Sequence, residues 1–115
     1  MTTRGSVEEL RINFARQLMA ASRSDDPRIE DVFRRVPREA FLPPAPWQIV
    51  VSGRYVATPG DDPAFIYQNV LVALDADKGI NNGEPHLHAR WIGAVAPKPG
   101  EHVVHIGAGM GYYTA

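Results

Sequence analysis

Near its C-terminal end the chain carries a glycine loop that follows directly on an apolar stretch. The residues His102–Ile106 predict a buried strand, and glycines follow it at every second position, namely Gly107, Gly109 and Gly111. Glycine permits sharp turns and lets a ligand approach the main chain closely, where a side chain would block it. The loop therefore indicates a site for a small cofactor.

The spacing of these glycines excludes two phosphate-binding loops. The dinucleotide fingerprint G-x-G-x-x-G needs a third glycine where this chain has Tyr112, and the Walker loop needs a lysine that is absent here. The spacing G-x-G-x-G that remains is similar to the loop of S-adenosylmethionine-dependent methyltransferases. On local grounds alone, an ordinary tight turn after a strand fits the same residues.

Helices are predicted before and after the middle of the chain. The first covers residues 6–23, because apolar residues recur there at steps of three and four, and Ser6 with Glu9 forms a capping box. A second begins at Asp26-Pro27 and runs to Arg35. Its predicted buried side consists of Ile29, Val32, Phe33 and Val36.

The middle of the chain is interrupted by prolines and predicts extended structure. Residues 47–51 predict a short edge strand, residues 65–74 an extended segment, and residues 75–83 a loop. Pro85 then suits the first position of a helix that runs to about Ala96. That helix carries one apolar stripe at steps of four, formed by Leu87, Trp91 and Val95.

Two stretches resemble the protein-L-isoaspartate O-methyltransferase family. The first, Val32–Pro43, is similar to the family's early helix and its R-V-P-R-x-x-F-x-P exit. The second, Ile80–Ala115, holds a loop, a Pro-His-x-His-Ala helix start, a Pro-Gly turn and the glycine loop with its tyrosine. The resemblance implies methyl transfer from S-adenosylmethionine to a carboxyl group. It also implies an α/β fold: a Rossmann-like class I methyltransferase domain behind an N-terminal helical extension.

The resemblance also assigns roles to residues. It places Asn82, Gly83 and Glu84 near the transferred methyl group, as catalytic residues. The cofactor would be bound by eight residues: Asn81, Asn82, His88, His105, Gly107, Ala108, Gly109 and Gly111. The chain departs from the family twice, with Gly83 in place of a serine and His105 in place of an acidic residue. Gly83 has no hydroxyl to orient a carboxylate, and Glu84 would repel one unless it faces away or is protonated.

Each candidate residue also has a simpler interpretation. His88 can be a partly buried hydrogen-bonding residue that the helix dipole keeps neutral, and Glu84 can simply favour a helix start. Local turn chemistry explains Asn81-Asn82-Gly83. The four histidines lie at spacings that put no metal site together, so no metal is expected. Trp47, Tyr55 and Trp91 are expected in the core, and Arg34, Arg35 and Arg38 on a solvated face.

Composition narrows the class of protein further. With 12 basic and 13 acidic residues the net charge is −1, which gives no footprint for nucleic acid or an anionic membrane. The chain has no cysteine and no apolar run of transmembrane length, so we expect a cytoplasmic protein. Its partner would be a protein or small-molecule methyl acceptor.

The 115 residues are expected to form three segments: a helical subdomain at 1–43, a proline-rich extended segment at 44–79, and the start of an S-adenosylmethionine-binding domain at 80–115. A parallel sheet needs further strands beyond the first one. We therefore expect a truncated fold or a second chain that completes the sheet. Two alternatives stay open, a non-catalytic binding module and a decayed methyltransferase homologue.

Overall fold

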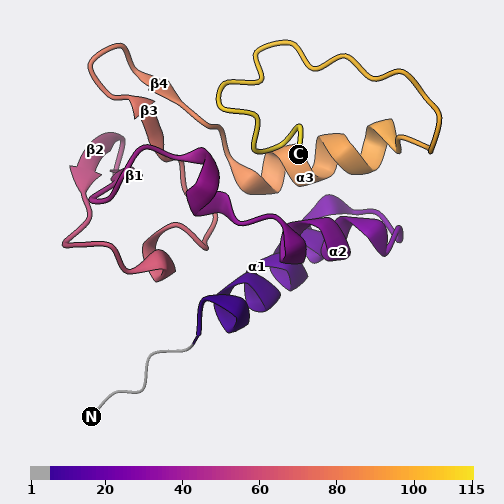
Figure 1. Ribbon diagram of the computed structural model, residues 1–115, viewed down its shortest axis with the longest axis horizontal. Coiled ribbons are helices and arrows are strands. Elements are labelled where there is room, and N and C mark those ends of the chain that lie inside the picture. Colours follow the sequence, from indigo (N-terminus) through magenta and orange to yellow (C-terminus); the bar gives the residue numbers. More distant parts are fainter. Residues whose placement is uncertain (1–5) are drawn as a thin grey trace.

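The computed structural model describes residues 6–115 (Figure 1). Residues 1–5, which begin the predicted helical subdomain, lie outside the described residues. Three helices contact one another, and two pairs of short antiparallel strands lie beside them. The chain thus combines helices with strands, as the predicted α/β class requires. The division into three segments stays a prediction.

Helix α1 spans Val7–Ser22 and begins at a complete capping box. The hydroxyl of Ser6 accepts a hydrogen bond from the backbone N–H of Glu9 at 3.1 Å. The Glu9 carboxylate accepts one in return from the N–H of Ser6 at 3.2 Å. Phe14 and Leu18 on the apolar side are buried. The predicted helix and its cap are both confirmed.

We expect Ser6→Ala to lower the free energy of unfolding by about 1 kcal/mol, because the substitution leaves an orphan N–H at the helix start. In a domain of this size that corresponds to a fall in Tm of about 4 °C. Ser6→Thr is the control, since its hydroxyl can still cap the helix. A thermal melt in which Ser6→Ala and Ser6→Thr coincide would contradict the role of the cap.

Helix α2 spans Arg28–Arg35, and a 3-10 turn, η1, follows at Arg38–Phe41. Ile29 and Phe33 are buried, as predicted. Val32 is 40% exposed, so its predicted burial is wrong. It lies about 100° round the helix from Phe33 and therefore falls at the edge of the packed side.

The strands form two hairpins. In the first, β1 (Gln48–Val51) pairs with β2 (Arg54–Ala57), and the predicted edge strand is confirmed. In the second, β3 (Ala73–Asp75) pairs with β4 (Ile80–Asn81), which lies inside the predicted loop. One bridge, from Ile49 to Val72, links them.

The predicted extended segment 65–74 reaches strand geometry only at its end. A 3-10 turn, η2, occupies Pro63–Phe65. Further along, the carbonyl groups of Ile66, Gln68 and Val70 accept hydrogen bonds from the side chain of Arg38. Because these carbonyls are turned toward a guanidinium, they are unavailable to a neighbouring strand.

Helix α3 spans Pro85–Val95 and has proline at its first position, as predicted. The predicted apolar stripe is exposed, however: Trp91 is 53% exposed and Val95 67%. A second stripe at steps of four, formed by small residues, is the one that packs. Pro85 and Ala89 are buried, and a Cβ at Gly93 would approach the Cβ of Ser24 to 3.0 Å. The small side chains allow close contact with the end of α1, so the expected core position of Trp91 is wrong.

The predicted buried strand at residues 102–106 is also wrong. This segment has no strand geometry, and Val104 and Ile106 are 72% and 91% exposed. After α3 the chain forms a wide loop, and the C-terminal end of the chain lies beside α3 again (Figure 1). A strand needs a ladder partner for its N–H and C=O groups, and none of the described residues supplies one here.

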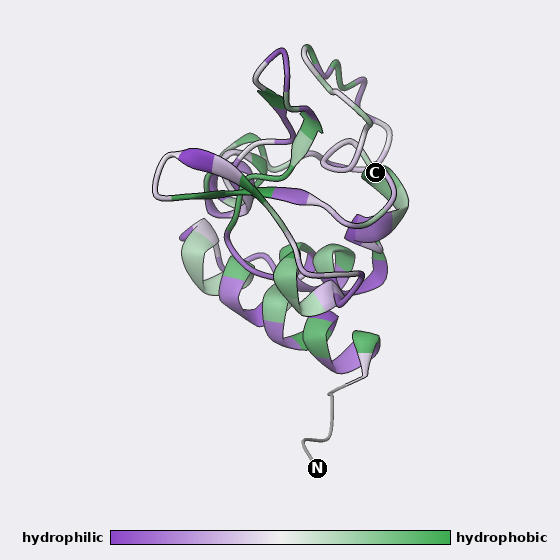
Figure 2. Ribbon diagram, turned by 90° about the vertical axis from the view of Figure 1, so that its left-hand side faces the viewer, coloured by the Kyte–Doolittle hydropathy of each residue, from purple (hydrophilic) through white to green (hydrophobic). Residues whose placement is uncertain are grey.

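The core draws on all parts of the described chain. Phe14, Phe33 and Tyr67 meet edge to face, and Tyr112 from the C-terminal segment packs against Phe33. The helices show hydrophobic and hydrophilic stretches in turn, as expected where one side is buried (Figure 2). Within residues 6–115, every helix is too short or too polar to cross a bilayer.

Candidate functional site

A small hollow of about 140 Å³ lies between the glycine loop, the turn before α3, and α3 itself. Its lining includes eight of the residues predicted for a site: Asn81, Asn82, Gly83, His88, His105, Gly107, Ala108 and Gly109. These come from two stretches, residues 81–88 and 105–109, separated by most of α3 and the loop that follows it. Tyr113 completes the lining, and sequence reasoning had missed it.

Asn82 lines this hollow, and two hydrogen bonds fix its side chain. Its Oδ1 accepts hydrogen bonds from Nη2 of Arg38 at 3.2 Å and from the N–H of Val72 at 3.3 Å. Its Nδ2 is buried and has no hydrogen-bond partner among the described residues. The Asn82 amide therefore keeps a donor that no residue of the described chain uses.

Asn81 is occupied by structural contacts. Its Nδ2 donates to the hydroxyl of Tyr55 at 3.1 Å, and its Oδ1 accepts from the N–H of Gly83 at 3.0 Å. The second of these bonds closes a turn of the Asx type, as the local interpretation predicted. Asn81 therefore contributes mainly to the shape of the hollow, because its Nδ2 and its Oδ1 both already make hydrogen bonds.

Arg38 contacts the hollow through its hydrogen bond to Asn82, and its burial shows that one prediction was wrong. Sequence reasoning expected a solvated arginine, but Arg38 is 0% exposed. Its guanidinium donates to three backbone carbonyls and to Asn82, and it lies 5.9 Å from the ring centre of Phe14. The only feature of the sequence that could have indicated this burial is the position of Arg38 directly after Pro37 in the family-like stretch.

His88 projects from α3 into the hollow and is fixed on two sides. Its ring stacks on Tyr113, with centres 3.8 Å apart and planes 11° apart. Its Nδ1 lies 2.9 Å from the carbonyl oxygen of Glu84. Burial lowers the pKa of His88, and the positive charge of Arg38 acts in the same direction.

Gly83 has to be glycine in this arrangement. Its φ is +81°, and a Cβ there would lie 2.3 Å from Cε1 of His88. Its carbonyl accepts a hydrogen bond from the hydroxyl of Tyr113 at 3.0 Å. Burial raises the pKa of Tyr113 to about 12, so this hydroxyl remains a donor at neutral pH.

The glycine loop adopts the conformation that its composition requires. Gly107, Gly109 and Gly111 all have positive φ values, of 72°, 58° and 89°. A Cβ at Gly109 would meet Leu74 at 3.0 Å. Within the described chain, the N–H groups of Gly107 and Gly109 make no hydrogen bond, so they are free to donate to a ligand.

Two predicted residues lie outside the hollow. Glu84 is exposed, and its carboxylate accepts a hydrogen bond from Nδ2 of Asn69 at 3.1 Å. Gly111 donates its N–H to the carbonyl of Ala108 and so stabilises the turn of the loop. Glu84 thus lies outside the hollow, but its charge still acts on His88, whose pKa it raises.

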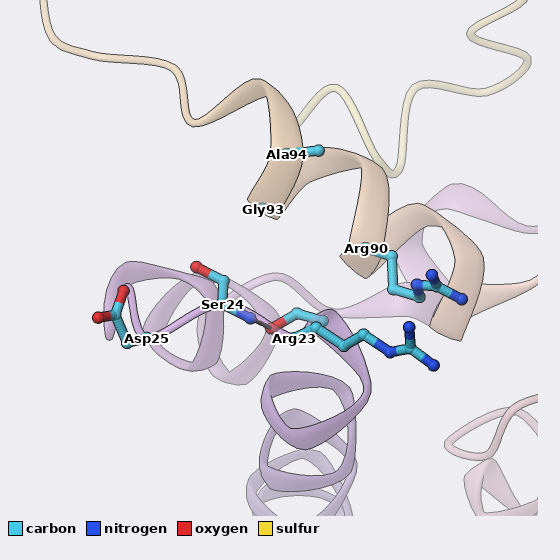
Figure 3. A pocket seen from close by; sticks show the side chains of 7 residues that line it. Arg23, Ser24, Asp25, Arg90, Gly93 and Ala94 are labelled. Atoms are coloured by element: carbon cyan, nitrogen blue, oxygen red, sulfur yellow. Dashed lines mark hydrogen bonds between the residues drawn. The ribbon is translucent and has the colours of Figure 1, made fainter.

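A larger hollow lies between the end of α1 and α3, with a volume of about 760 Å³ (Figure 3). Its labelled side chains include Arg23 and Arg90, which extend toward the same side. None of the predicted site residues lines it. No group of histidines and carboxylates in the described chain could hold a metal ion.

Comparison with known proteins relates the chain to methyltransferases. It is 32% identical over 107 residues to a protein named Protein-L-isoaspartate O-methyltransferase from Methylorubrum extorquens (strain PA1). The match covers 93% of this chain and 39% of the relative, and it confirms the resemblance seen in the two stretches. No family model matches the chain, and no solved structure matches it.

Proposed function

We propose that the hollow beside Asn82 and His88 binds S-adenosylmethionine and that the protein transfers its methyl group to an acceptor. The observation that carries this proposal is that the glycine loop meets Asn82, Gly83 and His88, which lie just before α3 and in its first turn. The methyltransferase relative supports the same reaction class. A Rossmann-like domain of class I type is part of the proposal.

The residues present fit one end of such a methyl donor. Asn82 and the N–H groups of Gly107 and Gly109 offer donors to a carboxylate or a hydroxyl. The stacked rings of His88 and Tyr113 offer aromatic surface to a sulfonium. Sites for drug-sized ligands usually measure about 300–1,000 Å³. A hollow of about 140 Å³ therefore holds only part of the molecule.

The acceptor is proposed to be a protein or a small molecule, in a cytoplasmic setting without nucleic acid. The relative's name suggests an isoaspartyl carboxyl group as the acceptor. At position 83 this chain has glycine, which offers no hydroxyl to orient such a group. Since the chain spans about 39% of that relative, the activity of the whole relative comes to this chain only as a proposal. A decayed methyltransferase homologue that keeps the same hollow stays an alternative.

A thermal-shift series tests the cofactor directly. S-adenosylmethionine and S-adenosylhomocysteine are expected to raise Tm, because a ligand at a hundred times its Kd stabilises by about 2.7 kcal/mol. NAD is expected to have no effect. His105→Ala should reduce the shift, since His105 lines the hollow. His102→Ala is the matched control, because His102 is also exposed but lies outside the hollow. Equal stabilisation by NAD would contradict the proposal.

The second candidate, a binding module, is favoured by an exposed apolar surface. Trp91, Val95, Val103, Val104 and Ile106 are all more than half exposed, which is unusual for such residues in one region. The same thermal-shift series separates the two candidates. A chain that is stable without ligand and unaffected by both S-adenosyl compounds would favour the module.

A further inference from the structure

Two arginines without a partner in the described chain border the larger hollow. Arg23 is the C-cap of α1 and Arg90 lies in the middle of α3, and both are exposed. Figure 3 shows the two side chains extending toward the same side. Within residues 6–115 neither guanidinium makes an ion pair or a hydrogen bond. Both are therefore able to bind an anionic ligand.

The contact between α1 and α3 brings the two arginines to one hollow. Arg23 has a left-handed backbone, with a φ of +57°. The hydroxyl of Ser22 stabilises this turn, because it donates to the carbonyl of Met19 at 2.6 Å and accepts from the N–H of Ser24 at 3.2 Å. Gly93 allows α3 to approach the same turn, since a Cβ there would lie 3.0 Å from the Cβ of Ser24. The second arginine lies three residues before this glycine.

The carboxylates that border the arginines leave them unpaired. Asp25 lines the larger hollow, but Figure 3 shows it extending to the opposite side from the two guanidinium groups. Glu84 lines a second hollow beside the same arginines, and its carboxylate accepts a hydrogen bond from Asn69 at 3.1 Å. An anion supplied by a ligand would also relieve the repulsion between two like charges.

The space beside the arginines is larger than a bare anion needs. The larger hollow measures about 760 Å³, and the second, of about 440 Å³, shares Arg23 and Arg90 with it. Sites for drug-sized ligands usually measure about 300–1,000 Å³. Small or apolar residues line much of both hollows, namely Ala20, Ala21, Leu87, Gly93 and Ala94. The lining therefore suits a molecule that carries an anionic group on a larger body.

We propose that Arg23 and Arg90 form a binding site for a phosphoryl group carried by a larger molecule. A phosphoryl group on a side chain carries a charge of about −1.5 to −2 at neutral pH and three acceptor oxygens, so it can bond to both guanidinium groups at once. A single carboxylate has one charge and balances only one arginine. The site is separate from the hollow proposed for the methyl donor, because the two share no lining residue.

The test is an NMR titration of the protein, followed at the Nε–H resonances of its arginines. The probes are free O-phosphoserine, a peptide that contains phosphoserine, and the same peptide with unmodified serine. We expect saturable shift changes at Arg23 and Arg90 with both phosphorylated probes, and none at Arg34 or Arg35, which pair with Asp31. Tighter binding of the phosphorylated peptide indicates a modified side chain as the source of the group, and equal binding indicates a small phosphorylated molecule.

Substitution of each arginine separates a built site from general attraction. Arg23→Gln and Arg90→Gln are each expected to weaken binding of the phosphorylated probes at least about tenfold, because each removes a charge-assisted pair. Arg16→Gln is the matched control. It removes the same charge from an exposed position on α1 that lies outside both hollows, so it should change the affinity less than about twofold.

Three results would overturn the inference. The first is an equal loss of affinity in Arg16→Gln, since binding would then follow net charge alone. The second is the absence of shift changes at both arginines with either phosphorylated probe at millimolar concentration. The third is equally tight binding of the unmodified peptide. S-adenosylhomocysteine should bind Arg90→Gln as it binds the unmodified protein, so failure of this site and failure of the proposed function are distinguishable.

Discussion

Replacement of Arg38 by alanine is expected to lower the free energy of unfolding by about 3–5 kcal/mol. The guanidinium is fully buried and donates to the carbonyls of Ile66, Gln68 and Val70 at 2.5, 3.3 and 2.8 Å. Without it, these acceptors lose their partner and Asn82 loses one of the two donors that orient it. Urea denaturation followed by circular dichroism measures the loss.

Two further variants identify the cause. Arg38→Lys keeps the charge but cannot reach all the acceptors from one ammonium group, so it should recover only part of the stability. Arg35→Ala is the matched control, because Arg35 is exposed and makes one surface ion pair with Asp31. That change should cost less than about 0.5 kcal/mol. If Arg38→Ala is as stable as Arg35→Ala, then the buried guanidinium does not organise this part of the fold.

Replacement of Gly83 by alanine is expected to cost about 2–3 kcal/mol and to displace His88. The backbone there is left-handed, which costs a non-glycine residue about 1 kcal/mol or more. The new Cβ would also lie 2.3 Å from the His88 ring. That ring is held by stacking on Tyr113 and by the Glu84 carbonyl, so it must give up both contacts.

Gly79 provides the matched control for this prediction. Its φ is +68°, but a Cβ there would meet nothing within 4 Å. Gly79→Ala should therefore show the backbone cost alone, and the difference between the two variants measures the clash with His88. In a His88→Ala background that difference should disappear. Equal losses for Gly83→Ala and Gly79→Ala in the unmodified background would contradict the packing described here.

Local patterns in the sequence predicted the features that depend on neighbouring residues. Ser6 and Glu9 predicted the start of α1, and Pro85 predicted the start of α3, because capping and proline chemistry act within a few residues. The positive φ values of the glycine loop follow from its composition in the same way. That residues before α3 and residues of the glycine loop lie around one hollow could be predicted only from the resemblance.

Features that depend on distant partners were missed or wrongly predicted. The burial of Arg38 follows from carbonyls about thirty residues away, which no local pattern reports. Trp91 and Ala89 both belong to stripes at steps of four, and only the packing against α1 decides which stripe is buried. A strand at 102–106 requires a partner strand, and the segment alone cannot indicate whether one is present.

The most direct test of the central claim is a nitrogen-15 NMR titration of the chain with S-adenosylhomocysteine, which also reports weak binding. We expect chemical-shift changes at residues 81–83, His88, residues 107–109 and Tyr113, and no change at Arg23 or Arg90 in the larger hollow. Shift changes confined to the larger hollow, or none up to millimolar ligand, would contradict the proposal that the glycine loop and α3 together bind the methyl donor.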